Sequence, residues 1–169
     1  MQGSIIYPLN DMAQTMPDLY HKNIEKYSGR EHIMRERVAT LNDALWNDCV
    51  FLCPINPDLL YQELAKVNLR RSHNQSFYKI PISSLDTSRL TIFKFTSWKN
   101  GKIELKDDLI PYNKEYLIKR QSVPQDTIGY YEDMSRTGTL QVPLFFRYVP
   151  HVLHLGPIDV SNSKIVTVN

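Results

Sequence analysis

Long apolar runs, a strong charge of either sign and a set of cysteines are all missing from this sequence of 169 residues. No stretch approaches the roughly 18 apolar residues that cross a membrane. The N-terminus also lacks the basic and apolar regions of a signal peptide, so we expect a cytoplasmic protein. A net charge of +2 is too small to indicate nucleic-acid binding from the overall field. Two cysteines are too few for a disulfide framework.

Several sequence motifs for nucleotide and acyl chemistry are missing as well. The chain has neither a Gly-x-x-x-x-Gly-Lys loop nor a Gly-x-Gly-x-x-Gly loop, and it has no nucleophile elbow. Internal repeats, low-complexity tracts and evident linkers are missing too. The hydrophobic share of 42% and the charged share of 22% are ordinary for a folded protein. These features predict one globular domain over residues 1–169.

The N-terminal half carries helix signals. Pro17 and Asp18 suit the first turn of a helix. Ser28 and Glu31 match a capping box, and apolar residues at helical spacing follow as far as Leu45. Arg37 would then leave this second helix at the rim of its buried face, where it either extends to solvent or reaches into a cleft.

The segment Cys49–Cys53 is apolar throughout and predicts a central strand. In a strand the two cysteine Cα atoms would lie roughly 13 Å apart, which is beyond disulfide reach. We therefore expect buried, unreactive thiols. Asn56 and Pro57 then predict a helix start, with Asn56 as the N-cap.

The C-terminal half is richer in strand signals, and the whole pattern indicates an α+β fold. We expect a central mixed or antiparallel sheet, flanked by helices that come mainly from residues 17–67. Asn100-Gly101 is a hairpin signal. The expected strands are Ser4–Tyr7, Phe77–Ile82, Leu90–Thr96, Val142–Val149, Val152–Leu155 and Lys164–Val168, and a further helix is expected from Pro124 to Gly138.

Polar residues beside the expected strands are the first site candidates. Trp46, Asn47 and Asp48 precede the apolar strand, where they either form a turn with a packed indole or line a pocket. His151 and His154 would point to opposite faces of a strand, which disfavours a shared metal. His151 alone is a candidate site residue.

Several stretches, taken in order, resemble the DarT family of ADP-ribosyltransferases, toxins that modify DNA bases using NAD. "HIMRERV" (32–38) resembles the family's arginine-bearing helix. "DCVFLCPINPDLLY" (48–61) resembles its apolar strand with the Pro-x-x-Pro-x-Leu-Tyr-type segment. "FYKIPISSL" (77–85) and "FRYVPHVL" (146–153) resemble the strand that follows and the terminal strand pair.

The resemblance implies a toxin or phage-conflict setting and NAD as a substrate. It also implies a histidine where this chain has Pro8, and a catalytic glutamate near Val142, where Gln141 stands. A transferase without that glutamate would need another acid, such as Glu31 or Asp48, to stabilise the transition state and act as the base. On this interpretation the catalytic candidates are Arg37, Asp48 and Gln141, and the NAD-binding candidates are Tyr7, Asn10, Arg35 and Tyr61.

Two other classes of function remain open. A non-catalytic interaction protein, such as an immunity or antitoxin partner, would use exposed aromatic side chains as contacts. A nucleic-acid-binding module would use basic side chains and would weaken steeply with salt. The candidates are Tyr112, Tyr116, Tyr130 and Tyr131 for the first class, and Arg70, Arg71 and Lys94 for the second.

Overall fold

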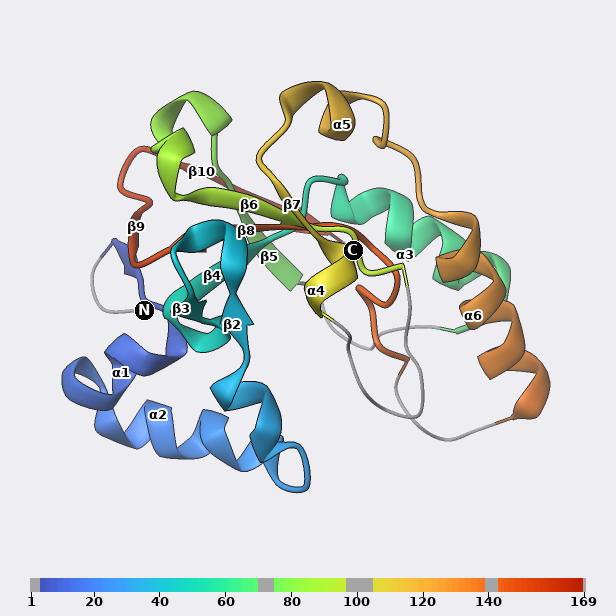
Figure 1. Cartoon of the computed structure of the whole chain (residues 1–169). Coiled ribbons are helices and arrows are strands. Elements are labelled where there is room, and N and C mark those ends of the chain that lie inside the picture. Colours follow the sequence, from blue (N-terminus) through green and yellow to red (C-terminus); the bar gives the residue numbers. More distant parts are fainter. Residues whose placement is uncertain (1–3, 70–74, 97–104, 139–142, 169) are drawn as a thin grey trace.

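A computed structural model describes residues 4–69, 75–96, 105–138 and 143–168. Its largest sheet has four antiparallel strands, in the spatial order β4, β8, β6, β7 (Figure 1). Contrary to the expectation, the Cys49 strand is at the edge of this sheet, because β8 pairs with one side of it and no described strand with the other. The bounds are Cys49–Leu52 for β4, His151–Leu155 for β8, Leu90–Phe93 for β6 and Leu109–Pro111 for β7.

Three smaller antiparallel pairs surround this sheet. The β2–β3 pair joins neighbouring segments of the chain, whereas the other two pairs join segments that are far apart in the sequence. The pairs are β1 (Ile5–Ile6) with β9 (Ile158–Asp159), β5 (Gln75–Lys79) with β10 (Lys164–Val168), and β2 (Arg37–Val38) with β3 (Ala44–Leu45).

The N-terminal helices form one flank of the molecule, drawn in blue in Figure 1. Helix α1 spans Leu9–Thr15, and α2 spans Pro17–Ile24 with Pro17 in its first turn as expected. The 3-10 helix η1 (Glu25–Tyr27) continues α2.

The helix expected from Ser28 to Leu45 is wrong. The structure instead has the 3-10 helix η2 (Glu31–Arg35), followed by the β2–β3 hairpin. Asn42 and Asp43 between the two strands have φ of 54° and 57°. Asn and Asp tolerate this left-handed conformation, and a right-handed helix cannot pass through it. The apolar spacing therefore serves a turn and a hairpin, with Val38 and Leu41 buried.

The helices on the other flank follow their sequence signals closely. Helix α3 spans Pro57–Lys66, and the side chain of Asn56 accepts a hydrogen bond from the Asp58 backbone N–H at 3.2 Å. Helix α6 spans Gln125–Thr137 and ends at Gly138, whose φ is 61°. The two helices pack together (Figure 1).

Short elements complete the described fold. Residues 143–149 do not form the expected strand, and Tyr148 has a φ of 61°, which breaks an extended run. Val142 and the Asn100-Gly101 pair lie outside the described residues. The remaining helices are α4 (Leu105–Asp108), α5 (Lys114–Ile118), η3 (Ala39–Leu41), η4 (Trp46–Asp48), η5 (Ile82–Ser84) and η6 (Thr87–Arg89).

The α+β class is confirmed, with antiparallel pairing in every described sheet. One core cluster includes Trp46, Phe93 and Leu153 under the N-terminal flank, and another joins α3 to α6 around the fully buried Tyr131. Within the described ranges, no helix combines the length and the apolar character that a membrane crossing needs.

Candidate functional site

A cleft of about 720 Å³ lies between the N-terminal flank, strand β4 and the segment 144–147. This volume falls within the range of about 300–1,000 Å³ that small-molecule sites occupy. We call it the Trp46 cleft. Its lining residues are Tyr7, Pro8, Leu9, Met12, Asn23, Lys26, Tyr27, Arg30, Ile33, Trp46, Asn47, Cys49, Val50, Phe51, Phe93, Phe95, Leu144, Phe145, Phe146, Arg147 and His151.

Aromatic rings form much of the wall. The Trp46 ring lies 4.7 Å from Phe51 and 5.2 Å from Phe93, measured between centroids. Phe93 stacks on Phe95 at 5.1 Å. Strands β4 and β6 place these rings, since Phe51 and Phe93 project from them toward the cleft. Phe51 keeps 39% of its surface exposed, so the wall includes an accessible ring.

His151 lies within this aromatic wall. Its ring centroid is 6.0–6.4 Å from those of four phenylalanines: Phe51, Phe93, Phe95 and Phe146. Burial lowers the pKa of His151 to about 4, against a smaller opposing effect of the Val149 carbonyl. The residue as a whole is half-buried, while its Nδ1 atom is buried and has no hydrogen-bond partner among the described residues. His151 is therefore a neutral imidazole at pH 7.

Asn47 presents a second polar side chain to the cleft. It is 2% exposed, and its Oδ1 accepts a hydrogen bond from the Tyr27 hydroxyl at 3.2 Å. Burial raises the pKa of Tyr27, with Arg30 acting in the opposite sense, so this hydroxyl stays protonated and donates. The Nδ2 of Asn47 is buried and has no hydrogen-bond partner in the described part of the chain.

Cationic side chains belong to the same lining, and none of its 21 residues is an Asp or a Glu. The Lys26 ammonium donates to Asn23 Oδ1 at 2.7 Å. The Arg30 guanidinium donates to the Lys26 carbonyl at 2.5 Å. Arg147 lies over the Tyr130 ring at 4.5 Å. The cleft is therefore a place where negative charge is favoured.

Two bulky residues in a left-handed conformation flank the cleft. Phe95, which lines it, has a φ of 55°, and Tyr148 has a φ of 61°. Their rings pack at 5.7 Å. Side chains of this size rarely adopt positive φ, and such strain concentrates at functional sites.

The structure brings together only part of the predicted NAD site. Tyr7 lines the cleft. Asn10 does not, and its Nδ2 donates to Asp48 Oδ1 at 2.6 Å, while Asp48 Oδ2 accepts from the Leu45 N–H at 2.8 Å. Burial, and secondarily the Asp48 charge, raise the pKa of the neighbouring Asp11. These polar groups thus bind one another beside the cleft.

The other predicted site residues lie elsewhere. Arg37 is exposed on the β2–β3 hairpin, and its guanidinium donates to the Asp43 carbonyl at 2.8 Å. Arg35 is also exposed, and neither arginine lines the cleft. Tyr61 lies in α3 and does not line the cleft. Its ring is 4.8 Å from Phe145, and its buried hydroxyl has no hydrogen-bond partner among the described residues. Gln141 is outside the described residues.

The structure also places the alternative acid Glu31 and the histidines and cysteines that were considered as metal ligands. Glu31 is exposed and accepts from the Gly29 N–H at 2.8 Å. His154 Nδ1 is 3.1 Å from the Gly156 carbonyl, and His154 does not line the cleft. Both cysteines are free, and burial raises the pKa of Cys49 to about 12 and of Cys53 to about 11. No group of three potential metal ligands occurs within the described ranges.

The surface residues predicted for partner binding have mixed outcomes. Tyr131 is fully buried, and its hydroxyl donates to the Phe145 carbonyl at 2.5 Å, so its prediction as an exposed contact is wrong. Tyr112, Tyr116 and Tyr130 are half-buried. Lys94 is also half-buried, and the two arginines at 70 and 71 lie outside the described residues.

The sequence indicates part of the lining and not the rest. The polar cluster before β4 and His151 were both considered as pocket residues, and Trp46, Asn47 and His151 do line the cleft. Lys26, Arg30 and the segment 144–147 were missed. No local pattern marks them, because they meet the strands only through the tertiary fold.

The described residues form an α+β fold with a cleft whose lining combines aromatic rings with cationic side chains and has no carboxylate. Comparisons of the chain with protein-family models, with curated proteins and with solved structures found no match.

Proposed function

We propose that this protein binds a small anionic ligand that carries an aromatic ring, and that it does so in the Trp46 cleft. One observation carries the proposal: the lining combines stacked aromatic rings with Lys26, Arg30 and Arg147 and includes no carboxylate side chain. Rings stack on aromatic side chains, and a phosphate or carboxylate forms charge-assisted hydrogen bonds with Lys and Arg.

The shape of the site supports the same ligand class. Lys26 and Arg30 lie close together in one segment. The Lys26 ammonium donates to Asn23, and the Arg30 guanidinium donates to the Lys26 carbonyl. The aromatic wall around Trp46 and His151 comes from other elements, η4, β4, β6 and β8. A ligand with its charge at one end and its ring at the other therefore fits this lining.

NAD is the first ligand to test, because the DarT resemblance implies it and because it has both phosphates and aromatic rings. The transferase activity that the resemblance implies stays a prediction. Its described acid candidates, Glu31 and Asp48, do not line the cleft and bond to groups of their own chain. Ligand binding is therefore the function for which the geometry offers direct support.

Isothermal titration calorimetry with NAD, AMP and ribose 5-phosphate tests this proposal. We expect AMP or NAD to bind the folded protein and ribose 5-phosphate to bind more weakly. Lys26 and Arg30 are the exposed cations of the lining, and we call them the rim cations. A Lys26→Ala, Arg30→Ala variant removes two exposed ionic contacts to the ligand. At about 0.5–1 kcal/mol each, their loss weakens the affinity by roughly 5- to 30-fold.

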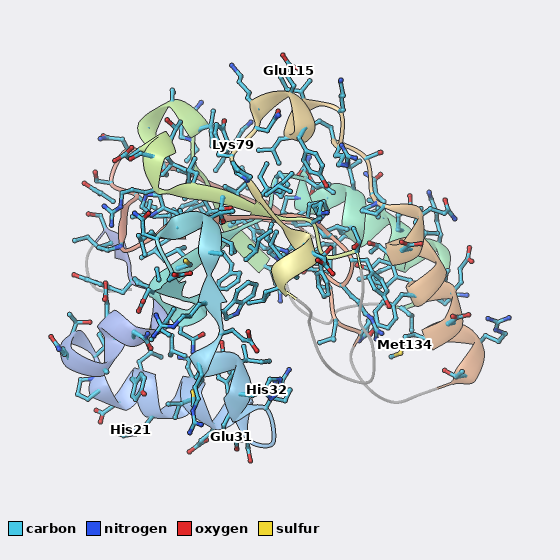
Figure 2. The ribbon with its side chains drawn as sticks, in the orientation of Figure 1. His21, Glu31, His32, Lys79, Glu115 and Met134 are labelled. Atoms are coloured by element: carbon cyan, nitrogen blue, oxygen red, sulfur yellow. The ribbon has the colours of Figure 1, made fainter. Side chains whose placement is uncertain are left out.

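A matched control removes two cations far from the cleft. Lys79 and Lys119 are both exposed and neither lines the cleft. Figure 2 shows Lys79 at the end of the molecule opposite His21, Glu31 and His32. The Lys79→Ala, Lys119→Ala variant has the same net charge as the rim variant and should keep the wild-type affinity. Equal losses in the two variants would mean a general charge effect, and no binding of any aromatic anion at millimolar concentration would refute the proposal.

A further inference from the structure

We propose that the ring of the ligand is a hydrogen-bonding heterocycle, a nucleobase, and that Asn47 is the residue that selects it over a hydrocarbon ring. This inference rests on the proposed function and specifies the chemical class of its ligand. Asn47 donates from its Nδ2 to a ring acceptor such as a purine nitrogen, while the flanking aromatic rings hold the two faces of the base.

The amide of Asn47 is oriented for this task. Tyr27 donates to Oδ1, which fixes the amide plane and leaves Nδ2 directed away from that bond. Nδ2 is buried in a residue that lines the cleft, and it has no hydrogen-bond partner among the described residues. A buried amide donor without a partner is uncommon in a folded protein and calls for an explanation. A ligand acceptor in the cleft supplies one.

His151 provides the complementary group. Its imidazole is neutral, and its buried Nδ1 has no hydrogen-bond partner in the described part of the chain. A neutral imidazole offers one donor and one acceptor. Asn47 and His151 therefore give the aromatic wall hydrogen-bonding groups of both kinds, which match the alternating acceptors and amino groups on the edge of a base. A hydrocarbon ring satisfies neither of them.

The same geometry predicts which kind of ring binds more tightly. A hydrocarbon ring in the cleft leaves the buried Asn47 donor without a partner, whereas a base supplies an acceptor. A site with a buried polar group rejects an analogue that cannot pair with it. We therefore expect AMP to bind more tightly than 1-naphthyl phosphate, whose two-ring hydrocarbon is similar in size to a purine, by between about 5- and 100-fold.

Wild-type protein tests this without any variant. In a sample labelled with ¹⁵N, the side-chain amide signal of Asn47 should shift on titration with AMP and should shift much less with 1-naphthyl phosphate or ribose 5-phosphate. An Asn47 signal that moves equally with AMP and 1-naphthyl phosphate would overturn the inference.

Variants provide the second test. Asn47→Leu replaces the amide by a hydrocarbon of similar size, so it should weaken AMP binding by about 5- to 100-fold and leave the affinity for 1-naphthyl phosphate unchanged or higher. Thr91→Val is the control, because Thr91 is a fully buried polar residue outside the cleft lining. It should change stability without changing the ratio of the two affinities. If Asn47→Leu does not fold, Tyr27→Phe removes the hydroxyl that orients the amide and should reduce the same ratio.

The outcomes separate the two proposals. If AMP and 1-naphthyl phosphate bind equally well and both depend on the rim cations, the cleft binds aromatic anions but Asn47 does not select a base. If neither compound binds, the proposed function fails together with this inference. If AMP binds and Asn47→Leu keeps the wild-type preference for it, another residue reads the ring and the assignment of Asn47 is wrong.

Discussion

His151 should make the stability of this protein fall as the pH decreases from 7 to 5. Burial lowers its pKa from 6.5 to about 4 in the folded state, so the unfolded chain binds more protons between these values. The contribution of neutral His151 to the free energy of unfolding is fully present above pH 6.5 and is lost as the pH falls toward 4. Between pH 7 and pH 5, the full shift corresponds to about 2 kcal/mol. Because the residue is half-buried, solvent screening brings the expected loss to about 1–2 kcal/mol.

The test is urea unfolding of wild type and of His151→Phe at pH 7 and at pH 5. The phenyl ring suits the surrounding phenylalanines and cannot take up a proton. We expect the variant to lose about 1–2 kcal/mol less than wild type between the two pH values. Burial also lowers the pKa of His154, and this contribution is common to both proteins. His32→Gln is the control, since His32 is exposed and outside the cleft. The reasoning is refuted if His151→Phe and wild type show the same pH dependence.

Two further predictions concern the segment from β4 to α3. Cys49 and Cys53 should not react with a thiol reagent at pH 8 in the folded protein and should react in urea, because burial raises their pKa values to about 12 and 11; fast labelling of native protein, followed by absorbance, would contradict this. Asn56→Ala should lower the free energy of unfolding by about 1 kcal/mol, because α3 loses its N-cap. Asn68→Gly should lower it by less in the same denaturation assay, because glycine adopts the φ of 58° at this position without strain.

Local signals in the sequence were sufficient for some elements. Asn56 and Pro57 predicted the start of α3, and Gly138 marked the end of α6, since a cap or a left-handed glycine acts within one turn. The helix predicted over residues 28–45 is wrong for the same reason. Its capping box and apolar spacing are local features, while the positive φ of Asn42 and Asp43 and the pairing of β2 with β3 determine the actual structure.

The predicted site shows a similar division. The sequence leaves a turn and a pocket lining as alternatives for Trp46, Asn47 and Asp48; Trp46 and Asn47 line the cleft, and Asp48 does not. The arginine chosen as a cleft residue is on an exposed hairpin instead. Its placement depended on the expected helix, so one wrong element displaced the residue that it carried.

By itself the sequence determined the α+β class, the strand at Cys49 with its free cysteines, and the capped helices α3 and α6. These follow from side-chain spacing, capping and composition, which are properties of neighbouring residues. The tertiary structure alone decided that Lys26 and Arg30 meet Trp46, Phe93 and His151 around one cleft. Residues so far apart in the chain come together only when the sheet and its flanks pack, because the burial of apolar surface that drives this packing depends on all of them at once.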